Sequence, residues 1–264
     1  FYYLESCLSV TSLHALDPIV KIRKSLSNDV WKCSDLVWSA LLLLATTRAS
    51  KKQESMTESQ PNPAIITVGE ELVWGELANG NQQWMLQWLK EQNQPAGIAM
   101  TLPDHQYIIA KWLRELHKEC YPLIVSGGIG GTHDDCTRQA IAQSLGIPII
   151  RHPECYSILV KRYQDRLNEA RARMADLPEG CELIENPEGA PGFHVQGVFA
   201  FPGFPSMLKA MLPMTLPTWK RGSSEWKIQE IILDVPESDV AEAVENFSNQ
   251  WPNSRLGIYA HSLQ

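Results

Sequence analysis

Glycines and carboxylates that stand close together in the middle of the chain carry its strongest chemical signal. Four glycines lie in the five residues 127–131, and Asp134 and Asp135 follow. Glycines at the start of a helix let backbone N–H groups approach a phosphate or another anion. Two carboxylates beside a phosphate are tolerated when a cation lies between them, so the pattern predicts a phosphate site with Mg²⁺ or a similar hard divalent metal.

Two known phosphate motifs do not account for this segment. A dinucleotide-binding GxGxxG pattern that starts at Gly128 would need glycine where His133 stands. A P-loop would need a Gly-Lys-Ser or Gly-Lys-Thr ending, which the segment lacks. A simpler interpretation stays open, in which the glycines form only a turn and Asp134 or Asp135 only caps a helix.

A strand must end just before the glycines, and a helix must begin just after the carboxylates. Residues 123–125 are apolar and partly β-branched, which predicts the end of a buried strand. Residues 137–145 place apolar side chains at helical spacing, and Gly146 closes that helix. Similar patterns predict strands at 64–68, 96–102, 147–150 and 195–200, and helices at 79–93, 104–120, 156–174 and from 206 onward. We expect Asp104 to cap the second of these helices and Trp112 to face inward.

Strands that alternate with single helices predict a three-layer α/β/α fold around a mostly parallel sheet. In such a sheet the ligand crevice lies at the carboxyl ends of the strands. Two more loops rich in glycine and proline, 186–193 and 201–205, flank the predicted strand 195–200. We therefore expect these loops to face the glycine segment.

Composition narrows the class of partner. The chain has 264 residues, 44% apolar content and a formal net charge of -7, which describe a globular chain rather than one that binds nucleic acid or an anionic membrane. A small molecule is the expected ligand. The six cysteines are scattered without a Cys-x-x-Cys pair, which favours reduced thiols in the cytoplasm.

Three regions are expected along the chain. Residues 1–55 are predicted to be an extension without a folded role, with Met56 as a plausible natural start. Their apolar run 36–45 is too short to cross a bilayer and is nearer in length to a signal-peptide core. The main α/β domain is expected at 56–215. A linker at 213–224 then leads into a small α+β lobe at 216–264, with a strand at 226–234, a helix at 237–247 and a strand at 255–260.

The segment GGIGGTHDDCT, residues 127–137, resembles the GGLGPTHDDVT signature of the competence/damage-inducible protein A (CinA) family. Other motifs agree in the same order: 69–72 is similar to that family's GDEL, Asn81 to the Asn of its DTN, 186–193 to NPxGTAPGF, 202–205 to PGVP and 256–259 to the start of IGSYP. Asp104 is similar to the aspartate before the family's second helix. The resemblance covers most of residues 64–262.

This resemblance implies the molybdopterin-binding (MoaB/Mog-like) fold, with a pocket for a phosphate-containing pterin or nucleotide, and self-association of the domain. It also implies metal-assisted hydrolysis of an ADP-ribose-like diphosphate. Asp135, with Asp134 and Glu71, would hold Mg²⁺, Mn²⁺ or Co²⁺ and activate a water, so Asp135 and Asp134 are the candidate catalytic residues. The pattern and the resemblance together place ligand contacts at Ser126, Gly127, Gly128, Gly130, Gly131, Thr132, Thr137, Asn81, Gly192, Pro202 and Gly203.

Several positions depart from the family pattern. Gly131 replaces a proline, Asn79 replaces the Asp of DTN, and Met207 replaces a glutamate. The loss of two carboxylates keeps a second function open, a module that binds molybdopterin or a nucleotide without turnover. Longer family members carry a nicotinamide-mononucleotide deamidase domain after this one, and we expect no such activity from these residues.

Overall fold

The computed structural model describes residues 20–22, 61–220, 231–233 and 237–250 of the chain. The chain divides into two compact units, Glu58–Glu225 and a second unit formed by Phe1–Thr57 with Trp226–Gln264.

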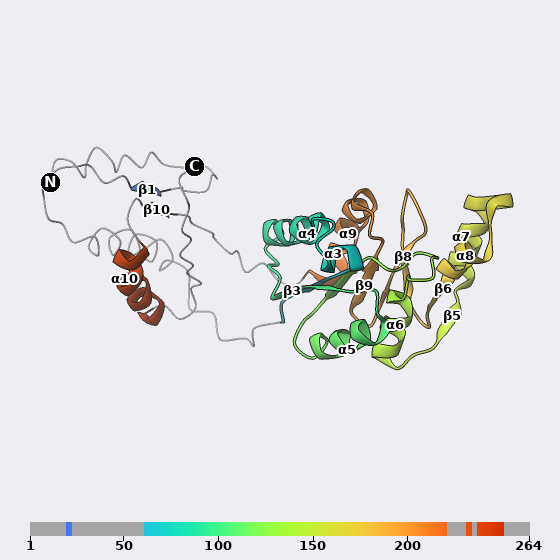
Figure 1. The fold of residues 1–264 in the computed structure, drawn as a ribbon, viewed down its shortest axis with the longest axis horizontal. Coiled ribbons are helices and arrows are strands. Elements are labelled where there is room, and N and C mark those ends of the chain that lie inside the picture. Colours follow the sequence, from blue (N-terminus) through green and yellow to red (C-terminus); the bar gives the residue numbers. More distant parts are fainter. Residues whose placement is uncertain (1–19, 23–60, 221–230, 234–236, 251–264) are drawn as a thin grey trace, which may run out of the picture. The chain divides into compact units, whose positions relative to one another are not determined.

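A six-stranded sheet forms the centre of the unit Glu58–Glu225 (Figure 1), in the order β3-β2-β4-β9-β8-β7. Four neighbouring strands run parallel: β3 (Ile98–Leu102), β2 (Ala64–Val68), β4 (Leu123–Ser126) and β9 (Val198–Phe201). The last two, β8 (Gly192–Val195) and β7 (Glu182–Ile184), run antiparallel to their neighbours. The predicted mostly parallel α/β sheet is therefore confirmed.

Helices cover both faces of this sheet (Figure 1). Helices α4 (Gly80–Glu91) and α9 (Pro205–Trp219) lie on one face, and α5 (Gln106–Leu116) and α6 (Thr137–Leu145) lie on the other. Alternate residues of each central strand enter different cores: Ile65 and Ile124 pack under α4 and α9, whereas Ile66 and Val125 pack under α5 and α6. The period-two pattern of the strands thus produces the three layers.

Two predicted elements are each divided in the structure. The predicted helix 156–174 is α7 (Pro153–Tyr163), η1 (Gln164–Arg166), α8 (Glu169–Ala172) and η2 (Arg173–Ala175). The break follows from Gln164, whose φ of 46° cannot continue a helix. The predicted strand 195–200 is instead the β8–β9 hairpin, because Gln196 and Gly197 turn the chain with φ of 45° and 84°.

Three smaller predictions also change. Strand β5 (Ile149–Arg151) pairs with β6 (Asp176–Pro178) in a separate two-stranded sheet. The predicted linker that starts at Pro213 is helical as far as Trp219, because α9 continues through Pro213 and Pro217. Trp112, predicted to face inward, is 38% exposed, whereas Ile109 and Leu113 of the same helix are buried.

The second unit contains three described elements. Strand β1 (Val20–Ile22) pairs in parallel with β10 (Ile231–Leu233), and α10 (Glu237–Gln250) follows. Three residues of the predicted extension 1–55 therefore have a strand partner. The predicted strand 255–260 lies outside the described residues. In the part of the chain that the structure describes, none of the helices is both long and apolar enough to cross a bilayer.

Candidate functional site

The parallel strands end side by side at one edge of the main sheet. Their register places Thr101, Thr67, Ser126 and Phe201 in one row across β3, β2, β4 and β9. The connections after β2 and β3 lead to opposite sides of β2, which makes the space between the ends of β2 and β4 a topological switch point. The short helix α3 (Glu70–Val73) follows β2 at this edge, and the predicted glycine segment follows β4.

Glycine is required where this segment, which we call the glycine loop (residues 127–135), leaves β4. Gly127 and Gly128 have backbone φ angles of 108° and 68°, which residues with a side chain rarely adopt. A Cβ atom on Gly127 would overlap the carbonyl oxygen of Val68, and one on Gly128 would overlap the hydroxyl of Thr137. The loop backbone therefore packs directly against the end of β2 and the start of α6.

The Asp135 carboxylate closes the glycine loop on itself. It accepts hydrogen bonds from the backbone N–H of Gly130 at 2.9 Å, from the backbone N–H of Thr132 at 2.8 Å and from the Thr132 hydroxyl. The residue that precedes α6 is Cys136, which makes no side-chain capping bond. The interpretation of Asp134 or Asp135 as a cap of α6 is therefore wrong, because Asp135 turns back into its own loop.

The loop after β9 faces the glycine loop, as the sequence predicted. The Ser126 hydroxyl donates to the Pro202 carbonyl at 3.1 Å, and the backbone N–H of Gly127 donates to the Phe201 carbonyl at 3.0 Å. The Asn81 side-chain amide, from the start of α4, donates to the Gly203 carbonyl at 2.7 Å and to the Ser126 hydroxyl at 3.3 Å. The structure thus brings Asn81, Ser126, Pro202 and Gly203 together with the glycines.

Four buried side-chain polar atoms of the described residues have no hydrogen-bond partner. One is the side-chain oxygen of Asn81, and the other three lie in the first turn of α6: the Thr137 hydroxyl oxygen, Arg138 Nε and the Gln139 side-chain oxygen. Thr137 is the first residue of α6 and is fully buried beneath Gly128. Unsatisfied buried polar atoms are costly and uncommon in folded proteins. Their position marks the contact between the glycine loop, α4 and α6 as a place where hydrogen-bonding capacity is unused.

A buried arginine stands in the first turn of α6, just after the glycine loop. Arg138, the second residue of α6, is 2% exposed and donates to the carbonyl oxygen of Arg173 in η2. Burial lowers the pKa of Arg138, while the charges of Asp135 and Asp176 raise it. Gly131 of the glycine loop packs so closely on the Ala170 carbonyl that a Cβ atom would overlap it. This contact explains why glycine stands where the family pattern has proline.

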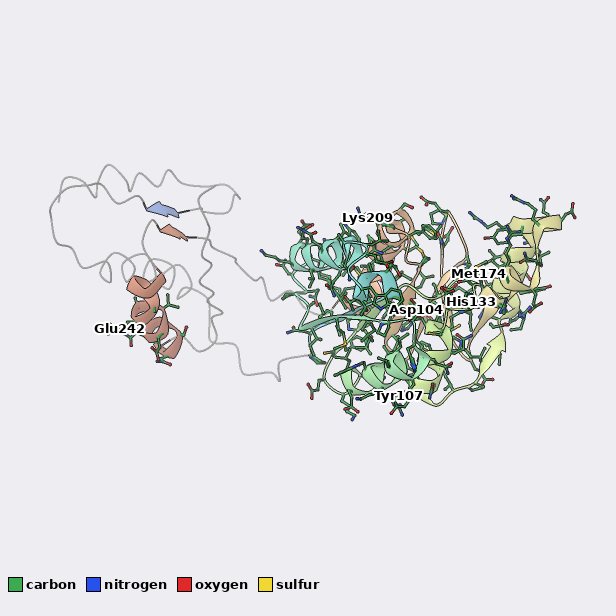
Figure 2. The ribbon with its side chains drawn as sticks, in the orientation of Figure 1. Asp104, Tyr107, His133, Met174, Lys209 and Glu242 are labelled. Carbon is green, nitrogen blue, oxygen red and sulfur yellow. The ribbon has the colours of Figure 1, made fainter. Side chains whose placement is uncertain are left out.

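Asp104 is a site residue that the sequence motifs did not single out as one. Its carboxylate accepts a hydrogen bond from the backbone N–H of Glu70 at 3.0 Å, at the start of α3, and does not cap α5 as predicted. Asp104 lies beside the glycine loop, which carries His133 (Figure 2). Burial raises the pKa of Asp104, and the charges of Glu71, Asp134 and Asp135 add to that rise.

The predicted metal ligands do not form a preassembled coordination site. Across the described residues, no three His, Cys, Asp or Glu side chains gather as ligands for one ion. Both carboxylate oxygens of Asp135 accept bonds from its own loop, and the Asp134 side chain is 61% exposed. The charges of Glu71, Asp134 and Asp135 nevertheless contribute to the raised pKa of Asp104, so these acidic groups share one neighbourhood.

The loop of residues 186–193, which was also predicted to face the glycine loop, contributes packing rather than an open surface. Gly192 is buried as the first residue of β8, where a Cβ atom would lie 2.5 Å from the Ala200 carbonyl oxygen. Gly192 therefore allows the hairpin strands to approach each other. Asn186 folds its own loop by donating to the Ala190 carbonyl at 2.8 Å, and its side chain also contacts the sulfur of Met207 at 3.5 Å.

Comparison with known proteins agrees with this fold. Residues 64–221 match the family described as "Probable molybdopterin binding domain". The chain therefore belongs to the molybdopterin-binding domain family.

Within that family its relatives include CinA-like proteins, as the glycine-loop motif indicated. A CinA-like protein of Gloeobacter violaceus is 30% identical over 201 residues, which cover 71% of this chain and 47% of the relative. A protein of Thermococcus kodakarensis is 34% identical over 216 residues, covering 74% and 85% of the two chains. The crystal structure of CinA from Thermoplasma acidophilum is 29% identical in sequence. It superimposes with a TM-score of 0.56, and the match covers 60% of this chain and 98% of that chain. The chain thus spans about half the length of its CinA-like relative and most of the length of the other two.

Proposed function

We propose that the unit Glu58–Glu225 binds a pterin of the molybdopterin type and that the glycine loop receives its phosphate. The observation that carries this proposal is the packing of the loop between the ends of β2 and β9 and the start of α6, where the helix has no side-chain cap. A helix N-terminus without a cap offers backbone N–H groups and a favourable dipole to an anion. The unused Thr137 hydroxyl lies at the same place.

Binding without turnover is the form of this function that the geometry supports best. Asp135, the candidate catalytic residue, is occupied as the acceptor that shapes the loop. The two positions that lack the family's carboxylates contact neighbouring side chains of the protein instead. Asn79 donates to the hydroxyls of Thr67 and Thr101 at 2.7 and 2.9 Å, and Met207 lies against Asn186.

Metal-dependent hydrolysis of a diphosphate is the second candidate, and one observation favours it. The charges of Glu71, Asp134 and Asp135 contribute to the raised pKa of Asp104, after the larger effect of its burial and against the hydrogen bond from the Glu70 backbone, which lowers it. A divalent cation among these groups would relieve their repulsion and would supply Lewis-acid stabilisation to a bound diphosphate. Asp104 and Glu71 are the residues that would hold it with least change to the loop, since Asp135 is already hydrogen-bonded.

Calorimetry on the full chain tests binding, with pyrophosphate and ADP-ribose as probes in the presence and absence of Mg²⁺, Mn²⁺ and Co²⁺. We expect micromolar to millimolar binding that Gly130→Ala removes, because the new Cβ would lie 2.5 Å from Asp135. Unchanged binding in that variant would take the loop out of the site. Formation of AMP and ribose 5-phosphate from ADP-ribose tests hydrolysis. Metal-dependent turnover that Asp104→Asn abolishes would establish the second candidate, and turnover that survives in this variant would contradict it.

We also propose that the protein acts in a reducing compartment such as the cytoplasm. Cys120, Cys136, Cys155 and Cys181 are free thiols in the described part of the chain. Burial raises the pKa of Cys136 to about 11 and that of Cys155 to about 12, which keeps both thiols protonated and unreactive at neutral pH. Self-association, which the family resemblance implies, is tested by light scattering of the purified chain.

A further inference from the structure

The two most exposed large apolar side chains of the unit Glu58–Glu225 lie at the edge that carries the glycine loop. Trp74 is 67% exposed and Phe204 is 69% exposed. Val73 and Leu77, beside Trp74 in sequence, are also exposed at 47% and 59%. Large aromatic surfaces left in water are unfavourable, and a concentration of them indicates a contact made with another molecule.

Their places in the fold put them on the two sides of the glycine loop. Trp74 directly follows α3, which comes after β2, and Phe204 directly precedes α9, which comes after β9. Strands β2 and β9 are the two neighbours of β4, the strand from which the glycine loop emerges. Neighbouring strands are about 4.8 Å apart, so the ends of β2 and β9 are separated by about 10 Å. Phe204 is also bonded in sequence to Gly203, whose backbone packs on Gly127.

Neither ring has a partner of the kind that other aromatic residues of the unit possess. Trp84 stacks on Trp88 at 6.0 Å, and Trp88 meets Trp219 edge to face at 6.4 Å. The exposed ring of Trp112 lies under the ammonium group of Lys111. Among the residues that the structure describes, no aromatic or cation–π contact involves Trp74 or Phe204. Their faces are therefore available for stacking.

We propose that Trp74 and Phe204 hold the planar fused heteroaromatic ring of the ligand whose phosphate lies in the glycine loop. This inference rests on the proposed phosphate site and adds the residues that recognise the rest of the molecule. Aromatic side chains stack on heteroaromatic rings with little dependence on the ring's hydrogen-bonding edge. The pair therefore selects a phosphate joined to a fused ring, such as a pterin or a purine, over a phosphate without one.

The experiment compares ligands with and without the ring on the full 264-residue chain. Calorimetry measures binding of neopterin triphosphate and ADP, which contain a fused ring, and of inorganic pyrophosphate, which does not. The variants are Trp74→Ala, Phe204→Ala and the conservative Trp74→Phe. Tyr107→Ala is the matched control, because Tyr107 is 60% exposed on α5 (Figure 2), away from the glycine loop.

We expect Trp74→Ala and Phe204→Ala each to weaken binding of at least one ring ligand by about tenfold or more and to leave pyrophosphate binding unchanged. Trp74→Phe and Tyr107→Ala should bind as the unmodified chain does. The inference is overturned if both alanine variants keep the affinity of the unmodified chain for the ring ligands. It is also overturned if the substitutions change only the oligomeric mass, because Trp74 and Phe204 would then form a contact between subunits. Pyrophosphate binding without any ring-ligand binding overturns the inference and leaves the phosphate site intact. Failure of all three ligands to bind the unmodified chain overturns the proposed function itself.

Discussion

The Asp135 carboxylate and the Gly130 backbone N–H are joined by a 2.9 Å hydrogen bond that spans the turn of the glycine loop. The other Asp135 oxygen receives the N–H of Thr132, so one side chain fixes two peptide groups of the same loop. The space beside Gly130 is filled by this carboxylate, which leaves no room for a Cβ atom. The acid and the glycine therefore depend on each other, and the shape of the loop depends on both.

Replacement of Asp135 by asparagine should destabilise the protein by about 1–3 kcal/mol. Asparagine keeps one acceptor oxygen but presents an NH₂ group to the second backbone N–H, which is then left without a partner. If the carboxylate only capped a helix, asparagine would serve nearly as well and the loss would be about 0.5 kcal/mol or less. The free energy of unfolding in urea, measured for both proteins, distinguishes these two roles.

Replacement of Gly130 by alanine should abolish phosphate binding while the protein stays folded. The new methyl group would displace the Asp135 carboxylate and with it the loop backbone that approaches the ligand. Gly80→Ala is the matched control, because Gly80 has open space around its Cβ position at the start of α4. Circular dichroism and calorimetry on both variants give the answer. Equal phosphate affinity in the two would contradict this account of the loop.

Much of the fold was predictable because local sequence signals agree with the final packing. Apolar runs such as Ala64–Val68 are buried on both sides, as parallel strands require, and helix α6 ends at Gly146 in the left-handed conformation that glycine favours. The β8–β9 hairpin was missed although its signal is present. The Gln196-Gly197 turn lies inside an apolar run, which was read as one continuous strand.

The roles of individual carboxylates at the site could not be predicted in the same way. An aspartate near glycines can cap a helix, bind a metal or accept bonds from its own loop, and only the folded backbone selects the third role for Asp135. Asp104 is separated by 34 positions from its partner Glu70, and their contact depends on the order of β2 and β3 in the sheet. Composition and spacing do not specify that order.

The protein should become less stable as pH rises, because the Asp104 carboxyl group then loses its proton and becomes charged. Its pKa is raised in the folded protein above the ordinary value of 3.8, mainly by burial. The folded state then binds the proton more tightly than the unfolded state does, so the free energy of unfolding decreases as pH rises from about 4 through the raised pKa. Asp104→Asn removes the charge and keeps an acceptor for Glu70. We expect this variant to melt above the unmodified protein at pH 7 and to lose that advantage near pH 4; a difference in Tm that is the same at both pH values would refute the argument.

The fragment 58–225 should fold without the rest of the chain. Both hydrophobic cores of the main sheet are formed by residues between Ala64 and Trp219. A unit that contains its whole core does not need other segments for stability. We expect the fragment to unfold cooperatively on heating, with a midpoint within about 4 °C of the one that this unit shows in the full chain. A difference of that size corresponds to a change of about 1 kcal/mol or less in the free energy of unfolding. Loss of cooperativity in the fragment would show that segments outside it contribute to the core.

Replacement of the buried Arg138 by methionine tests whether its charge is needed just after the glycine loop. Methionine avoids the cost of burying a cation, which favours the folded state. Against this gain, it leaves the Arg173 carbonyl without its donor and removes a positive charge near Asp135. Loss of one member of a buried polar pair usually outweighs the relief of desolvation, so we expect a loss of about 2 kcal/mol or more. Arg173→Met is the control, because it keeps the backbone carbonyl that Arg138 contacts and changes an exposed side chain, and it should cost about 0.5 kcal/mol or less. Urea unfolding of both variants decides the matter, and equal stability of the two would mean that the Arg138 side chain contributes packing alone.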